Sequence, residues 1–95
     1  MDLAEKAQVV DRIRLKLIDC IGTRLKLRAN LGRSRVIECE GTVLQAHPQL
    51  FIMNLERKRG HVARQSYQYV DILTGTVELS YIDSNESLFP IAVEA

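Results

Sequence analysis

The chain has 95 residues, 46% of them hydrophobic and 26% charged, with a net charge of +1. This composition is typical of a single globular domain, and it excludes collagen-like and disordered chains and a membrane-spanning segment. Residues 1–6 are too polar for a signal peptide, so we expect a cytoplasmic protein. Cys20 and Cys39 form no CxxC motif, and we expect both to be buried, unlinked thiols.

Charge is unevenly distributed along the chain. All 13 lysines and arginines lie in residues 1–64 together with seven acids, whereas residues 65–95 hold five acids and no base. Two interpretations remain open. The surface is polarised and binds an anionic partner, or the two halves neutralise each other once the chain folds.

Residues 2–20 are predicted to form an amphipathic helix. The apolar positions that share one stripe are Leu3, Ala7, Val10, Leu17 and Ile21. Asp2 suits the N-cap position and Gly22 the C-terminal stop. Because the apolar stripe is wide, we expect the helix to dock on the rest of the protein or on a second subunit.

After the helix the hydrophobic period changes to alternation, which predicts β-strands over residues 23–82. The five expected strands are residues 23–30, 35–46, 50–55, 62–69 and 76–82. Gly41 is predicted to mark a bulge or bend, and residues 71–75 to form one helical turn. Residues 83–95 are acidic and rich in turn formers, and we expect them to form a loosely held tail.

One helix followed by five short strands predicts a mainly β fold. The architecture we favour is a small five-stranded SH3-like or Sm-like barrel preceded by an N-terminal α-helix, forming a single domain over residues 1–95. A five-stranded oligonucleotide-binding barrel is the nearest alternative. Small barrels with apolar edge strands often pair, so we expect a homodimer.

The first hairpin is predicted to pair opposite charges across its strands. With a turn at residues 30–34, only one parity places the apolar side chains inward together. The resulting pairs are Leu25 with Cys39, Leu27 with Ile37, Arg24 with Glu40, and Lys26 with Glu38. Each charged pair contributes roughly 0.2–1 kcal/mol, so we assign Arg24 and Lys26 a structural role.

The remaining cations suggest a binding surface, which we call the basic rim. Arg28 would face Val36 rather than an acid, and the first and third turns of a meander lie at the same end. The expected rim comprises Arg28, Arg33, Arg35, Arg57, Lys58 and Arg59. Clustered cations suit phosphate or an acidic protein surface, and loops are where binding residues concentrate. The alternative is that these side chains are simply solvated.

No enzyme, cofactor or metal motif is recognisable. His47 and His61 have no cysteine or carboxylate at metal-ligand spacing, and no nucleophile-elbow, Walker or dinucleotide fingerprint occurs. We therefore expect a non-enzymatic protein without a cofactor or metal. Tyr67 and Tyr69 are predicted to share one face of a strand, where they either stack on bases or fill the barrel wall; we favour the second.

Several blocks of the sequence resemble the Veg family of small bacterial proteins. They are Gly22-Thr23-Arg24-Leu25, Ala29-Asn30, Gly32-Arg33, Glu38, Gly41, Pro48 with Leu50-Phe51, and Ser66-Tyr67-Gln68-Tyr69-Val70-Asp71-Ile72-Leu73-Thr74 running into Thr76-Val77-Glu78-Leu79. Together they span about residues 22–80 in the family's order, and the helix is similar to the family's N-terminal segment. His47 departs from the pattern, because an aromatic residue is expected before Pro48.

The resemblance implies a role rather than a reaction. Veg proteins are described as stimulators of biofilm formation that oppose a transcriptional repressor, and the family has no established catalytic or ligand site to carry across. The leading hypothesis is a regulator that binds an acidic patch on a transcription factor. The alternative is an Sm-like module that binds RNA or DNA through the basic rim, although few aromatics and near-neutral charge count against it.

Overall fold

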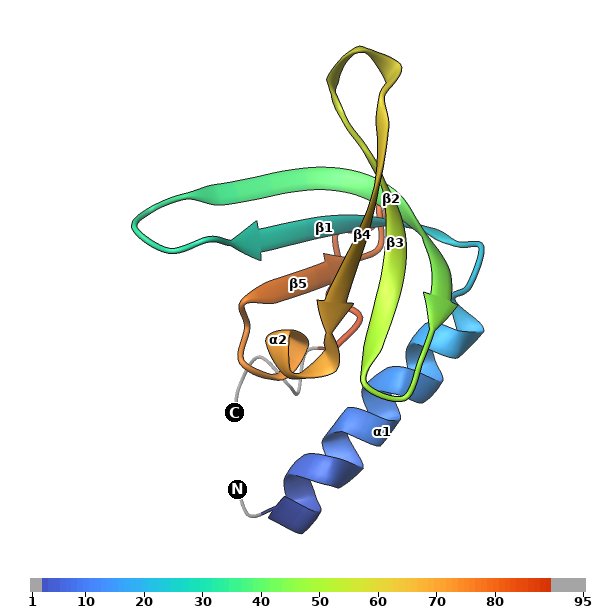
Figure 1. Cartoon of the computed structure of the whole chain (residues 1–95), viewed down its shortest axis with the longest axis vertical. Helices are drawn as coiled ribbons and strands as arrows, with labels where there is room; N and C mark the ends of the chain where they lie inside the picture. Colours follow the sequence, from blue (N-terminus) through green and yellow to red (C-terminus); the bar gives the residue numbers. More distant parts are fainter. Residues whose placement is uncertain (1–2, 90–95) are drawn as a thin grey trace.

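The structure is a computed structural model that describes residues 3–89, apart from the side chain of Lys58. The expected N-cap Asp2 and residues 90–95 of the expected tail lie outside the described residues. Figure 1 shows the chain order of the elements. These are α1 (Leu3–Asp19), β1 (Arg24–Asn30), β2 (Val36–Ala46), β3 (Leu50–Glu56), η1 (Lys58–Gly60), β4 (Val62–Gln68), α2 (Tyr69–Leu73) and β5 (Val77–Ser80).

The five strands form one antiparallel sheet in the order β4-β3-β2-β1-β5. The prediction of a mainly β fold with an N-terminal helix is confirmed. The predicted barrel is not, because β4 and β5 are the two edges of the sheet and do not pair. The short helix α2 connects these strands and contacts both of them, so the sheet curls without closing (Figure 1).

Alternation of apolar and polar residues decides which side of each strand is buried. Leu25, Leu27 and Ala29 of β1 are buried, as predicted, while the residues between them face outward. Strand β3 buries Phe51, Met53 and Leu55 in the same way. These side chains form one core with α1, α2 and β5.

Helix α1 docks through its C-terminal half. Ile13 and Leu17 are buried, and Cys20 follows them into the core just after the helix ends. Gly22, with φ +85°, lies where a C-terminal stop is expected. The stripe does not dock over its whole length, because Leu3 is 85% exposed and the first turns extend beyond the sheet (Figure 1). Among the described helices, none is long and apolar enough to cross a membrane.

The register of the first hairpin differs from the predicted one by two residues. Asn30 pairs with Val36, Arg28 with Glu38 and Lys26 with Glu40. The turn is the cause: Leu31 N–H donates to the Arg35 carbonyl, which leaves Asn30 as the last residue of β1 rather than the first of the turn. A shift of two keeps the inward residues inward but changes every cross-strand partner.

Gly41 is not the site of the bulge. The β2–β3 register shifts between Val43 and Gln45 instead, whereas Gly41 pairs regularly with Leu55. Glycine is required at this position for another reason: a Cβ there would lie 2.7 Å from the backbone oxygen of Asn54. The central strands thus approach each other more closely than a side chain would allow.

Residues 83–89 fold back onto the sheet rather than leaving it as a loose tail. Leu88 is buried, and its N–H donates to the carbonyl of Leu79 in β5. Ser87 forms an antiparallel bridge with Ser80, the last residue of that strand. This segment therefore covers the outer edge of β5.

Candidate interaction surfaces

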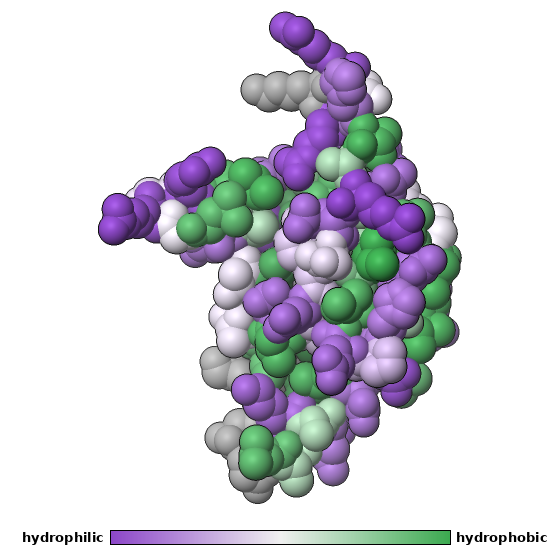
Figure 2. Space-filling view, viewed as in Figure 1, coloured by the Kyte–Doolittle hydropathy of each residue, from purple (hydrophilic) through white to green (hydrophobic). Residues whose placement is uncertain are grey.

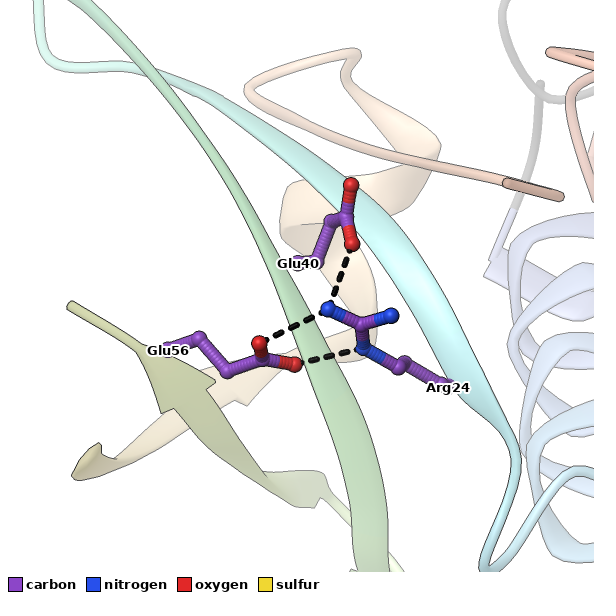
Figure 3. A network of polar contacts seen from close by, with 3 residues as sticks. All are labelled: Arg24, Glu40 and Glu56. Atoms are coloured by element: carbon purple, nitrogen blue, oxygen red, sulfur yellow. Dashed lines mark hydrogen bonds and ion pairs between the residues drawn. The ribbon is translucent and has the colours of Figure 1, made fainter. Parts of the chain in front are cut away.

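Arg24 is held by two carboxylates on neighbouring strands. Its Nη2 lies 2.7 Å from Oε1 of Glu40, and its Nε lies 2.6 Å from Oε2 of Glu56 (Figure 3). The predicted Arg24–Glu40 ion pair is therefore formed, although the two residues are not directly opposite. The hydrogen bond from Arg24 is the main cause that lowers the pKa of Glu56 below its ordinary value. Arg24 thus has the structural role assigned to it.

Arg28 does not belong to a basic rim. It lies opposite Glu38 of β2 on one side and Glu78 of β5 on the other, so the prediction that it lacks an acidic neighbour is wrong. Lys26 lies opposite Glu40 in the same row. The outer face of the central strands therefore alternates in charge, and its basic residues have acids close by.

The hairpin loops carry a second group of cations, which lie outside the charge-alternating face of the central strands. We call residues 31–35 the first tip and residues 57–60 the second tip. The first contains Arg33 and Arg35, and the second contains Arg57, Lys58 and Arg59. Within residues 3–89, no acid lies at ion-pair distance from the four arginines of the tips.

The two tips point in different directions. Figure 1 shows the β1–β2 hairpin extending to one side and the β3–β4 hairpin extending away from the rest of the sheet, and Figure 2 shows hydrophilic residues at both ends. The strong twist between neighbouring strands separates loops that lie at the same end of the meander. The expected rim is therefore two separate basic tips rather than one surface.

The first tip also exposes apolar residues, which sequence reasoning missed. Leu31 and Val36 are both exposed beside the tip arginines. Leu31 lies in the predicted turn next to Gly32. An apolar residue beside a turn glycine was the sequence signal from which this exposed apolar side chain could have been predicted.

The two candidate tyrosines fill the core side of the sheet. Tyr69 starts α2 rather than ending β4, is 1% exposed, and donates a hydrogen bond from its hydroxyl to the carbonyl of His47 at 2.6 Å. Its ring stacks on Phe51 at 5.7 Å, and the half-buried ring of Tyr67 contacts Phe51 at 5.9 Å. Burial raises the pKa of both phenols. The arrangement matches the wall-filling interpretation, and Tyr69 has no free ring face for a base.

The cysteines are free thiols whose environment disfavours reactivity. Cys20 is buried behind the helix and Cys39 is half-buried on the inner face of β2. Burial raises the pKa of both thiols, which keeps them protonated near neutral pH. No three His, Cys, Asp or Glu side chains of residues 3–89 are grouped so that they could hold a metal ion.

One surface hollow lies between α1 and the start of α2, with a volume of about 280 Å³. Its lining residues are Val10, Pro48, Gln49, Leu50, Gln68, Tyr69 and Val70. Tyr69 is its one ionisable group, and its hydroxyl is already bonded to the chain. The hollow therefore offers no acid–base pair for chemistry.

Comparison with known families gives one clear result. The model of a family described as "Biofilm formation stimulator VEG" matches residues 8–80. The matched region includes most of α1, all five strands and both hairpin tips. A comparison with curated proteins gives no match.

Proposed function

The chain belongs to the Veg family of biofilm formation stimulators, and on this premise we propose that it is a non-enzymatic regulatory protein that acts by binding another protein. Its partner is a transcriptional repressor or a complex that contains one. The protein binds an acidic region on the surface of this partner. By doing so it opposes repression and promotes the expression of biofilm genes.

The contrast between the paired and unpaired cations carries this proposal. Arg24 of β1 forms ion pairs with Glu40 and Glu56, whereas Arg33 and Arg59 at the tips have no acid within residues 3–89 at ion-pair distance. Clustered like charges repel one another, and the fold gains nothing evident from this placement. An acidic surface on a partner supplies the missing opposite charge and steers the encounter.

A nucleic-acid-binding module is the second candidate, favoured by the same tip arginines. Two features count against it. The tips diverge, so they do not form a continuous basic track for a phosphate backbone (Figure 1). Tyr69 is packed in the core, which removes one of the two tyrosines considered as stacking platforms for bases.

The test is affinity purification of the tagged full-length protein from extracts of its own cells, with and without nuclease. The variants are Arg33→Glu, Arg59→Glu and the double variant, with Arg33→Lys and Arg59→Lys as controls that keep the charge. Arg33 and Arg59 have positive φ of 47° and 63°, but glutamate and lysine are unbranched at Cβ like arginine, so these substitutions add no backbone strain. We therefore expect stability to change by less than about 0.5 kcal/mol and the variants to stay folded. We expect the double variant to lose the partner and the lysine controls to retain it.

Three outcomes distinguish the candidates. Loss of a nuclease-resistant protein partner only in the glutamate variants supports a protein-binding role. If the folded double variant recovers the partner as well as the parent does, the tips do not take part in the interaction. Recovery that disappears with nuclease, and weakens steeply with salt, favours the nucleic-acid alternative instead.

A further inference from the structure

The two edges of the sheet differ in how they are covered. Residues that follow β5 fold over its outer edge, where Leu88 N–H donates to the carbonyl of Leu79 and Tyr81 N–H to that of Glu86, both at 2.9 Å. Along β4, by contrast, residues 62–67 have no hydrogen-bond partner on their outer side within the described part of the chain. Within residues 3–89, the β4 edge is therefore the open edge of the sheet.

The hydrogen-bond alternation identifies the groups that face this open edge. Arg57 N–H donates to the carbonyl of His61 at 2.6 Å, and these residues continue the β3–β4 register. Since bonded and non-bonded pairs alternate in an antiparallel ladder, the N–H and C=O groups of Val62, Arg64 and Ser66 point away from β3. The N–H of Gln68 also points away from β3 by the same alternation, and it donates a hydrogen bond to the Asp71 carboxylate at 3.2 Å.

Strand β4 lacks most of the features that protect natural sheet edges. It is seven residues long, its pairing with β3 is uninterrupted, and it contains no proline. Val62 is 55% exposed, and Arg64 is the only charged residue in the strand. Edges that do not accept other strands are usually short, bulged, covered or rich in charge.

We propose that the β4 edge binds an extended acidic segment of a protein partner, which adds to the sheet as a sixth strand. This inference rests on the proposed protein-binding function and states where and how the partner docks. Main-chain hydrogen bonds to Val62, Arg64 and Ser66 provide the affinity of strand addition, and side chains provide its selectivity. Glutamate or aspartate on the outer face of the added strand lies beside Arg64.

The charges around β4 favour an acidic segment. Arg64 is exposed on β4, and Arg57 and Arg59 lie in the second tip, which directly precedes this strand. Of the two acids that flank β4 in sequence, Glu56 is already bonded to Arg24, and Asp71 accepts the N–H of Gln68 at the end of the strand. An incoming acidic strand therefore meets cations that have no acid of residues 3–89 at ion-pair distance.

The same charges disfavour a second copy of this chain as the added strand. Antiparallel pairing of two β4 strands centred on Arg64 places the two arginines directly opposite each other. Centring the pair on Gln65 places them on a near diagonal of the same face. Like charges in such positions are destabilising, so Arg64 selects against self-pairing while it attracts an acidic strand.

The experiment uses a short blocked peptide that alternates glutamate with threonine and valine, labelled with fluorescein, and the full-length protein. Binding is measured by fluorescence anisotropy, and amide hydrogen exchange locates it. We expect the peptide to protect the amides of Val62, Arg64 and Ser66, and added salt to weaken its binding. A peptide with lysine in place of glutamate should not bind.

Two pairs of variants separate backbone pairing from charge. Ser66→Pro removes an outward N–H without breaking the ladder to β3 and should weaken binding by about tenfold or more, whereas Ser66→Ala keeps the N–H and the affinity. Arg64→Glu should weaken binding to a similar degree, and Arg64→Lys should retain it. If Ser66→Pro does not fold, the Arg64 pair and the exchange data still decide.

Several results would overturn the inference. The first is that the folded variants Ser66→Pro and Ser66→Ala bind the peptide with equal affinity, and the second is that the peptide protects amides other than those of the β4 edge. The third is that no binding is seen at roughly millimolar peptide. The fourth is that protection of the edge amides rises with protein concentration, which indicates that a second copy of the chain binds there. The proposed function is judged separately by partner recovery. If Ser66→Pro still recovers the partner that the tip variants lose, the proposed function stands and the edge inference fails. If the edge binds the peptide but no protein partner is recovered, the proposed function fails, and the edge is shown only to accept an acidic strand.

Discussion

Arg24 and Glu56 form a two-point ion pair although a complete strand separates them in the sheet. Arg24 lies on β1 and Glu56 on β3, with β2 between them. The guanidinium Nε and Nη2 donate to the two carboxylate oxygens at 2.6 and 2.7 Å, and Nη2 also contacts Glu40 (Figure 3). One arginine thus links three strands on the outer face of the sheet.

This pair predicts how Glu56 titrates. Its pKa is lower in the folded protein than in the unfolded chain, mainly because Arg24 donates hydrogen bonds to the ionised carboxylate. The stabilising effect is therefore fully present above the unfolded pKa, about 4.3 for glutamate, and is lost as the pH falls through the lower folded pKa. In Arg24→Gln, NMR titration should find the pKa of Glu56 closer to its ordinary value. An identical titration curve in the parent and the variant would contradict the pairing.

Helix docking makes a second prediction, tested by two leucines of α1. Leu17 is fully buried, whereas Leu15 is 55% exposed on the opposite side. Leu17→Ala should lower the free energy of unfolding by about 2–5 kcal/mol, because it leaves a cavity between the helix and the sheet. Leu15→Ala makes the same chemical change at the surface and should alter it by less than about 0.5 kcal/mol. Urea unfolding of both variants checks this, and equal effects would mean that the helix does not dock as described.

The buried faces of the strands were predictable because they depend on local alternation. Leu25 and Leu27 were expected inward from their spacing alone, and the structure buries them. The register was not predictable in the same way. A shift of two residues preserves every inward position, so only the geometry of the turn after Asn30 distinguishes the two registers.

The candidate surface was only partly predictable, for a related reason. The sequence locates Arg33 and Arg59 in turns, which is correct. Whether two turns lie side by side depends on sheet twist, which accumulates over several strands and leaves no local sequence signal. The sequence predicted a closed barrel and missed the open sheet for a different reason: the helical turn expected over residues 71–75 begins already at Tyr69, so α2 takes the place of the end of the expected fourth strand.

The last prediction uses Arg28 to test the register and the charge pattern together. In the structure Arg28 lies between Glu38 and Glu78 on adjoining strands. Arg28→Glu would place three carboxylates side by side, and each direct like-charge pair costs roughly 0.2–1 kcal/mol. We therefore expect the free energy of unfolding to fall by about 1 kcal/mol at low salt. The loss should shrink at high salt, because the screening length falls from about 10 Å at 0.1 M to about 3 Å at 1 M.

Arg33→Glu is the matched control, since it makes the same charge change at the exposed first tip. It should alter the free energy of unfolding by less than about 0.5 kcal/mol at either salt concentration. Urea titrations of both variants at low and high salt measure the difference. In the alternative register Arg28 faces Val36 and loses its acidic neighbour on β2, so the salt-dependent difference between the two variants would be smaller. Equal, salt-independent effects would show that neither Glu38 nor Glu78 interacts with Arg28, although both lie opposite it in the sheet.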